Sequence, residues 1–143
     1  MKNVAELLKA KPSRLIAVKP EDSVLEAIKV MGRENIGALV VMTGERLVGI
    51  LSERDYARKV VLKGRSSEST RVEEIMTANV VCVSPRAKSR DCMALMSEKN
   101  IRHLPVVEEG RVVGMVSVRD IVTDIIADQD FTISQLESYI SGQ

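Results

Sequence analysis

Apolar and polar positions follow two periods along this chain, and the same succession of periods occurs twice. The runs LIAVKP and VVCVSP are rich in strand-forming residues and end at a proline, which is typical of short β-strands. Apolar residues then recur at helical spacing, from Val24 to Met31 and from Cys92 to Met96. Two apolar runs joined by a tight turn, and a second helical pattern, complete each copy. The pattern predicts two β-α-β-β-α units.

The two copies align without a gap. Gly114 lies 65 positions after Gly49, and Asp120 lies 65 positions after Asp55. Repetition at a fixed offset marks a duplicated structural unit. One copy of roughly 60 residues buries too little surface to be stable alone. We therefore expect an α+β fold in which two β-α-β-β-α repeats pack sheet to sheet with pseudo-two-fold symmetry.

Local signals predict several helix ends. Ser23 precedes Glu26 by three residues, the spacing of a capping box, so a helix should begin after Ser23. Asn35 and Asn100 suit helix C-termini because asparagine tolerates left-handed backbone geometry. The segment VEEIMT between the copies predicts one helical turn. We divide the chain into a first repeat with an N-terminal helix (1–66), a second repeat (67–130) and a C-terminal helical tail (131–143).

Charge and hydropathy argue against several kinds of partner. The chain is 45% apolar and 29% charged with a net charge of +1, so it offers no electrostatic attraction for nucleic acid or an anionic membrane surface. Its apolar runs are far shorter than the roughly 20 residues needed to span a bilayer. The opening stretch MKNVAELLKAK lacks the apolar centre of a signal peptide. We expect a soluble cytoplasmic protein.

The cysteines and the single histidine do not indicate a metal or catalytic site. Cys82 and Cys92 lack a CxxC spacing, so we expect no zinc and two buried thiols in a reducing compartment. No nucleophile and orienting group can be matched to His103. A packing or ligand-contact role is therefore expected for this histidine.

Each copy places Ser-x-Arg-Asp where a strand gives way to a helix. One such motif would be an ordinary helix cap, but its repetition with a preceding glycine favours a function. A helix N-terminus attracts phosphate, arginine donates to phosphate oxygens, and an ionised Asp accepts from both hydroxyls of a ribose. A nucleotide therefore suits both sets of residues: Ser52, Arg54 and Asp55, and Ser117, Arg119 and Asp120.

With its paired motifs VGILSERD and VGMVSVRD and the segment NIRHLPVV, the chain resembles a tandem CBS-domain pair, the module named after cystathionine β-synthase. The resemblance covers roughly residues 8–127. It implies a disc-like module, commonly dimeric, that binds adenosine-containing ligands such as AMP, ADP, ATP, NAD(H) or S-adenosylmethionine. It also implies a role as a sensor or regulatory subunit.

The resemblance assigns base-binding positions as well. In such modules the base rests against the strand that opens a repeat and the chain that enters the hairpin. The cleft of Asp120 would be lined by Thr77, Val80, Val81, Arg102, His103, Leu104 and Pro105, and that of Asp55 by Ser13, Leu15, Ile16, Gly37, Ala38 and Leu39. The first copy lacks a His-Leu-Pro feature, so we expect the Asp120 cleft to bind the tighter nucleotide.

Three functions compete on this evidence. The leading one is a regulatory module that binds an adenine nucleotide. It would be a homodimer, because the helices carry broad apolar faces that one pair of repeats cannot cover, and its regulated protein partner is unknown. The second is a structural dimerisation module whose clefts have lost their ligand. The third is a small nucleotide-dependent enzyme, for which the sequence supplies no acid–base pair or metal-binding set.

Overall fold

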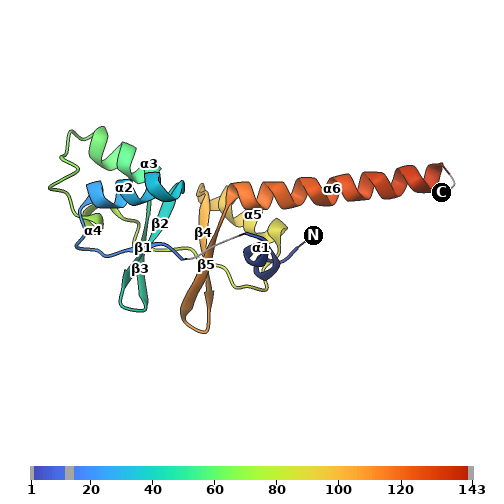
Figure 1. Ribbon diagram of the computed structural model, residues 1–143, viewed down its shortest axis with the longest axis horizontal. Coiled ribbons are helices and arrows are strands. Elements are labelled where there is room, and N and C mark those ends of the chain that lie inside the picture. Colours follow the sequence, from blue (N-terminus) through green and yellow to red (C-terminus); the bar gives the residue numbers. More distant parts are fainter. Residues whose placement is uncertain (1, 12–14, 142–143) are drawn as a thin grey trace. The chain divides into compact units, whose positions relative to one another are not determined.

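A computed structural model describes residues 2–11 and 15–141 of the 143-residue chain. Contacts between residues group the chain into two compact units. The first-repeat unit contains residues 15–81 with 109–112, and the second-repeat unit contains residues 2–11, 82–108 and 113–141. The predicted α+β class and tandem repeat are confirmed, with helices and small sheets in both units (Figure 1).

The first-repeat unit surrounds a three-stranded sheet in the order β1-β2-β3. Strand β1 (Ala17–Val18) runs parallel to β2 (Ala38–Thr43), which forms an antiparallel hairpin with β3 (Arg46–Ser52). The helical elements are α2 (Val24–Glu34), α3 (Glu53–Tyr56), the π-helical segment η1 (Ala57–Val61) and α4 (Val72–Ile75). Their apolar side chains form one buried cluster that includes Val24, Met31, Leu39, Leu51, Val60 and Ile75.

The second-repeat unit has the same order of elements, but its first strand is shortened. It contains α5 (Ser89–Lys99), β4 (His103–Glu108), most of its hairpin partner β5 (Arg111–Ser117), and α6 (Val118–Ile140). The strand predicted at VVCVSP is reduced to a single parallel bridge between Val83 and Val106. This bridge has two backbone hydrogen bonds, from the Val83 N–H to the Pro105 carbonyl (3.0 Å) and from the Val107 N–H to the Val83 carbonyl (2.9 Å).

The predicted helix ends are confirmed. Ser23 is the N-cap of α2, and its hydroxyl accepts from the Glu26 N–H at 3.1 Å. Asn35 and Asn100 end α2 and α5 in the left-handed conformation, each with φ of 54°. The segment VEEIMT does contain one helical turn, α4.

Helix α1 (Val4–Ala10) packs in the second-repeat unit, although it precedes the first repeat in the sequence. The N–H groups of Val4 and Ala5 donate to the carbonyls of Ala87 (2.8 Å) and Pro85 (2.9 Å). Gly114 permits a close approach, since a Cβ there would lie 2.9 Å from a methyl carbon of Leu8. The division at residue 66 followed the sequence repeat; the contacts instead group the N-terminal helix with the second copy.

Helix α6 is continuous across the boundary that the sequence suggested at residue 130. It runs for 23 residues without a break, and its second half extends beyond α5 and α1 of the same unit (Figure 1). The predicted helical tail is therefore the end of this helix rather than a separate element. No helix within the described parts of the chain has the length and hydropathy to cross a membrane.

Candidate functional site

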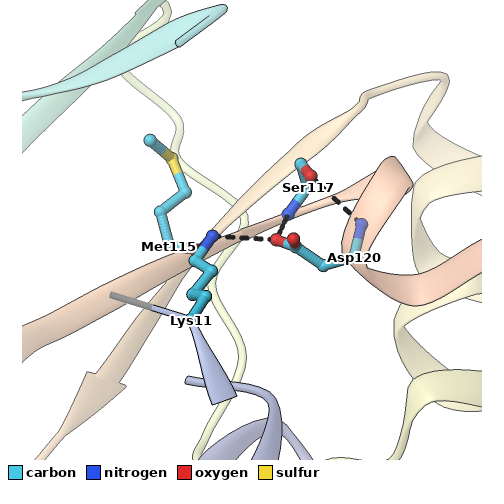
Figure 2. A network of polar contacts seen from close by, with 4 residues as sticks. All are labelled: Lys11, Met115, Ser117 and Asp120. Atoms are coloured by element: carbon cyan, nitrogen blue, oxygen red, sulfur yellow. Dashed lines mark hydrogen bonds and ion pairs between the residues drawn. The ribbon is translucent and has the colours of Figure 1, made fainter. Parts of the chain in front are cut away.

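The second Ser-x-Arg-Asp motif forms a rigid capping box where β5 becomes α6. The Ser117 hydroxyl accepts from the Asp120 N–H at 3.3 Å, and the Asp120 carboxylate accepts from the Ser117 N–H at 2.8 Å. This reciprocal pair satisfies two helix-end donors and holds the carboxylate beside the first turn of α6 (Figure 2). The helix cap and the candidate ligand-binding motif are thus the same residues.

Lys11, which follows α1, reaches the same carboxylate. Its Nζ donates to Asp120 Oδ2 at 2.9 Å and to the Met115 carbonyl at 3.0 Å (Figure 2). Burial alone would raise the pKa of Asp120, but the hydrogen bonds from Lys11 and Ser117 outweigh it and hold the pKa below its ordinary value. Asp120 is therefore ionised at neutral pH and accepts hydrogen bonds only.

The chain entering β4 lies against the start of α6. The Val118 N–H donates to the Arg102 carbonyl at 2.8 Å, which brings the segment from Arg102 to Pro105 beside the motif. Burial lowers the pKa of His103, with Asp120 opposing and Lys11 and Arg102 adding to the effect. His103 is consequently a neutral imidazole near Asp120, suited to packing or hydrogen bonding.

The first motif repeats this geometry where β3 becomes α3. The Ser52 hydroxyl accepts from the Asp55 N–H at 3.1 Å, and the Ser52 N–H donates to Asp55 Oδ2 at 3.0 Å. The Glu53 N–H donates to the Gly37 carbonyl at 3.0 Å, which is the counterpart of the bond between Val118 and Arg102. Both copies therefore place an aspartate and the chain entering the hairpin at one helix N-terminus.

A lysine neutralises Asp55 too, but it comes from the same helical segment. Lys59 Nζ lies 3.1 Å from Asp55 Oδ1 and donates to the Ile75 carbonyl at 2.9 Å. The spacing of four residues between Asp55 and Lys59 is a sequence signal for such a pair. Lys11 carried no comparable signal, because it lies 109 positions from Asp120. Sequence reasoning assigned neither lysine to its motif.

The predicted site residues fall into two groups. In the second-repeat unit, the end of β5 and the first turn of α6 carry Ser117, Arg119 and Asp120. The segment beside them contains Arg102, His103, Leu104 and Pro105. In the first-repeat unit, the motif residues Ser52 and Asp55 lie beside Gly37 and Ala38, and Ala38 pairs with Ser52 between β2 and β3. Ile16 packs against the core of this unit. Leu39 is fully buried and Leu15 is exposed. Ser13 lies outside the described residues.

Three of the predicted base-wall residues fall in the other unit from Asp120. Thr77, Val80 and Val81 belong to the first-repeat unit. Thr77 forms a bridge with Ile50, with N–H to carbonyl distances of 2.9 and 3.0 Å. Gly49 permits this approach, since a Cβ there would lie 3.2 Å from the Thr77 carbonyl oxygen. Assignment of Thr77, Val80 and Val81 to the Asp120 cleft stays a prediction.

The two arginines of the motifs are exposed. Arg54 lines a groove of about 700 Å³ between α2 and α3, together with Gly37 and Tyr56. A guanidinium at a helix N-terminus can donate a fork of hydrogen bonds to phosphate oxygens. The aspartate of each motif can therefore accept hydrogen bonds from ribose hydroxyls, and the arginine can donate hydrogen bonds to an anion.

The cysteines differ from the expectation in one respect. Cys92 is buried on α5, whereas Cys82 is exposed, because the strand predicted around it is reduced to a single bridge. Within residues 2–11 and 15–141, no group of three or more His, Cys, Asp or Glu side chains is arranged to hold a metal ion.

Two tandem copies of a strand, helix and hairpin unit, each with a Ser-x-Arg-Asp helix cap after its hairpin, define a class of duplicated α+β modules. The CBS-domain family model matches residues 4–62 and 72–127, which are most of the chain. The protein therefore belongs to the CBS-domain family, with two copies of the domain.

Solved structures of other family members are similar over nearly the whole chain. A protein with CBS domains from Burkholderia ambifaria MC40-6 is 51% identical with a TM-score of 0.86, covering 90% of this chain and 96% of that one. The CBS domain pair of protein MJ0100 was solved in complex with 5′-methylthioadenosine and S-adenosyl-L-methionine. It is 28% identical with a TM-score of 0.78, and the match covers 90% of this chain and 98% of that one.

Curated relatives include proteins of similar and of greater length. The mitochondrial CBS domain-containing protein CBSX3 of Arabidopsis thaliana is 42% identical over 127 residues, but this chain spans only 62% of its length. The CBS domain-containing protein YhcV of Bacillus subtilis is 30% identical over 117 residues, which are 82% of this chain and 83% of that protein.

Proposed function

We propose that this protein is a regulatory module that binds an adenosine-containing ligand through Asp55 and Asp120. The observation that carries the proposal is the repeated geometry of the two motifs. In each, a reciprocal cap fixes an aspartate carboxylate at a helix N-terminus beside the chain that enters a hairpin. A single helix cap can occur without a function, but repetition of the cap together with the same placement of the entering chain points to a shared ligand group.

The ribose diol is the ligand group that best fits an ionised carboxylate. A carboxylate accepts two hydrogen bonds from vicinal hydroxyls, and amide donors at the helix N-terminus favour an anion nearby. The ligands of the MJ0100 pair, 5′-methylthioadenosine and S-adenosyl-L-methionine, share an adenosine with AMP, ADP, ATP and NAD(H). We propose one of these adenine compounds as the ligand, with AMP, ATP or NAD(H) favoured by the exposed Arg54 and Arg119.

Isothermal titration calorimetry with AMP, ATP, NADH, 5′-methylthioadenosine and S-adenosylmethionine tests the proposal. Asp120→Ala should weaken binding at least tenfold, because each lost hydrogen bond to a charged group is worth about 1.5–3 kcal/mol. Glu6→Ala is the matched control, since Glu6 is the capping-box carboxylate of α1 in the same unit and belongs to neither motif. Absence of binding by all five compounds at millimolar concentration contradicts the proposal and favours a ligand-free structural module.

The two motifs should differ in affinity. The Asp120 motif adjoins His103, Leu104 and Pro105, whereas the Asp55 motif adjoins the smaller Gly37 and Ala38. Asp120→Ala should therefore weaken the tighter site more than Asp55→Ala does. Equal losses in the two variants would mean equivalent sites, and a larger loss from Asp55→Ala would reverse the ranking.

We further propose a cytoplasmic homodimer without catalytic activity of its own. Exposed apolar residues on α6, such as Val122 and Ile126, support self-association. The inosine-5′-monophosphate dehydrogenase of Methanocaldococcus jannaschii matches over 76% of this chain but only 21% of the enzyme's length. The remaining four fifths of that enzyme have no counterpart in this match, which supports a regulatory rather than an enzymatic role here.

A further inference from the structure

The second half of α6 carries an apolar stripe that its own unit leaves uncovered. Every residue from Gln129 to Ser141 is exposed, and this part of the helix lies beyond its neighbours in Figure 1. Exposed fractions reach 52% for Ile133, 57% for Leu136 and 82% for Ile140. Water-exposed aliphatic side chains on one stripe of a helix indicate a surface that another molecule covers.

The stripe has the spacing of a coiled-coil seam. Its members recur at alternating intervals of four and three residues, which is the a and d pattern of a heptad repeat. The a positions are all isoleucine, and the d positions are valine, glutamine and leucine: Ile126, Ile133 and Ile140, and Val122, Gln129 and Leu136. Isoleucine at a with leucine at d, the combination that Leu136 provides in one of the three d positions, favours a two-stranded parallel pair.

The charges beside the seam point to the same orientation. Asp130 and Glu137 occupy the flanking e positions, and Thr132 and Tyr139 occupy the g positions. An antiparallel pair would set the acidic e positions of both helices against each other, whereas a parallel pair sets each against an uncharged g position. The helix carries no Lys or Arg after Arg119, so an anionic membrane surface is a poor occupant.

We propose that two copies of this chain pair in parallel through this seam, Val122 to Ile140 on α6. The proposal deepens the homodimer proposed above and does not depend on ligand binding. The seam covers fewer than three heptads, which is short for a free-standing coiled coil. It therefore acts together with the attached domains, and its test uses the full chain.

Light scattering over a dilution series measures the dimer dissociation constant. Ile133→Glu should raise this constant at least tenfold, since it places two carboxylates at one a layer. Phe131→Glu is the matched control: Phe131 is 65% exposed, lies on the outer face of the same helix, and should leave the constant within twofold. Equal constants for the two variants overturn the seam, and a monomer at all concentrations overturns both the seam and the homodimer.

Disulfide cross-linking tests the orientation. Gln129→Cys and Leu136→Cys are made separately in a Cys82→Ser background, because Cys82 is the exposed native thiol. A parallel pair brings each d residue opposite its own copy, so both variants should form dimeric disulfides under mild oxidation. An antiparallel pair has one crossing centre, so cross-linking of only one variant, or of neither, overturns the parallel arrangement. Calorimetry of Ile133→Glu should show ligand binding comparable to the parent chain, which separates this proposal from the ligand site.

Discussion

Removal of the Lys11 ammonium should destabilise the second-repeat unit in a pH-dependent way. Lys11→Met keeps most of the aliphatic stem but loses two hydrogen bonds, to Asp120 and to the Met115 carbonyl. A hydrogen bond to a charged group contributes about 1.5–3 kcal/mol when buried, whereas an exposed ion pair contributes about 0.2–1 kcal/mol. The Lys11 side chain is 36% exposed and that of Asp120 24%. We therefore expect a loss of about 1 kcal/mol, or about 4 °C in Tm.

The pH dependence follows from the lowered pKa of Asp120. A carboxyl whose pKa is lower in the folded than in the unfolded state stabilises the fold above its unfolded value, near 3.8 here, and loses this contribution as the pH falls through the folded value. The stability difference between the parent chain and Lys11→Met should thus be complete at pH 7 and shrink below about pH 4.

Calorimetric melting between pH 7 and pH 3 provides the assay. Lys9→Met is the control, because Lys9 is an exposed lysine near the end of α1 and takes no part in the Asp120 network. Equal melting temperatures of Lys11→Met and Lys9→Met at pH 7 would refute the reasoning. A difference that stays constant down to pH 3 would show that Lys11 acts through something other than the ionised Asp120.

Other features of the fold lead to further predictions. Gly49→Val should destabilise the first-repeat unit by about 1–3 kcal/mol in urea unfolding, because its Cβ would lie 2.5 Å from Met76 Sδ and 3.2 Å from the Thr77 carbonyl oxygen; an unchanged midpoint would contradict this close approach. Asp124→Ala should cost at least about 2 kcal/mol, since this buried carboxylate accepts from a serine hydroxyl at 2.6 Å and a backbone N–H at 3.2 Å, and a neutral effect would disprove its role. A maleimide should label Cys82 in the native protein but Cys92 only after unfolding, and simultaneous labelling would contradict the buried position on α5.

The repeat in the sequence predicted most of the local structure because each signal depends on near neighbours. The caps at Ser52 and Ser117 and the left-handed Asn35 and Asn100 depend on residues within one helical turn. The two aspartates of the candidate site could be found for the same reason. The contact between Lys11 and Asp120 could not, because 109 positions separate them and no local pattern specifies which partner an amphipathic helix will cover.

Other differences between pattern and structure also have physical origins. The match between the copies fades near residue 130, yet no glycine or proline interrupts α6 from Val118 to Ile140. The strand around Cys82 was expected from β-propensity, but Pro85 ends the segment after one bridge. Local propensity indicates a preference for extended backbone, and pairing with a neighbour decides whether a strand forms.

The position of α1 has a consequence for the order in which the chain folds during synthesis. The segments of the first-repeat unit around its three-stranded sheet are nearly contiguous, from 15 to 81, so they can assemble as soon as they leave the ribosome. Helix α1 is made earlier, but the carbonyls that receive it belong to Pro85 and Ala87, and Asp120 comes later still. At about 5–20 residues per second, the buried face of α1 waits roughly 5–20 s for its partners. Lys11 therefore meets Asp120 only when the second repeat has been completed, and a nascent chain stalled before that point would expose α1 to chaperones.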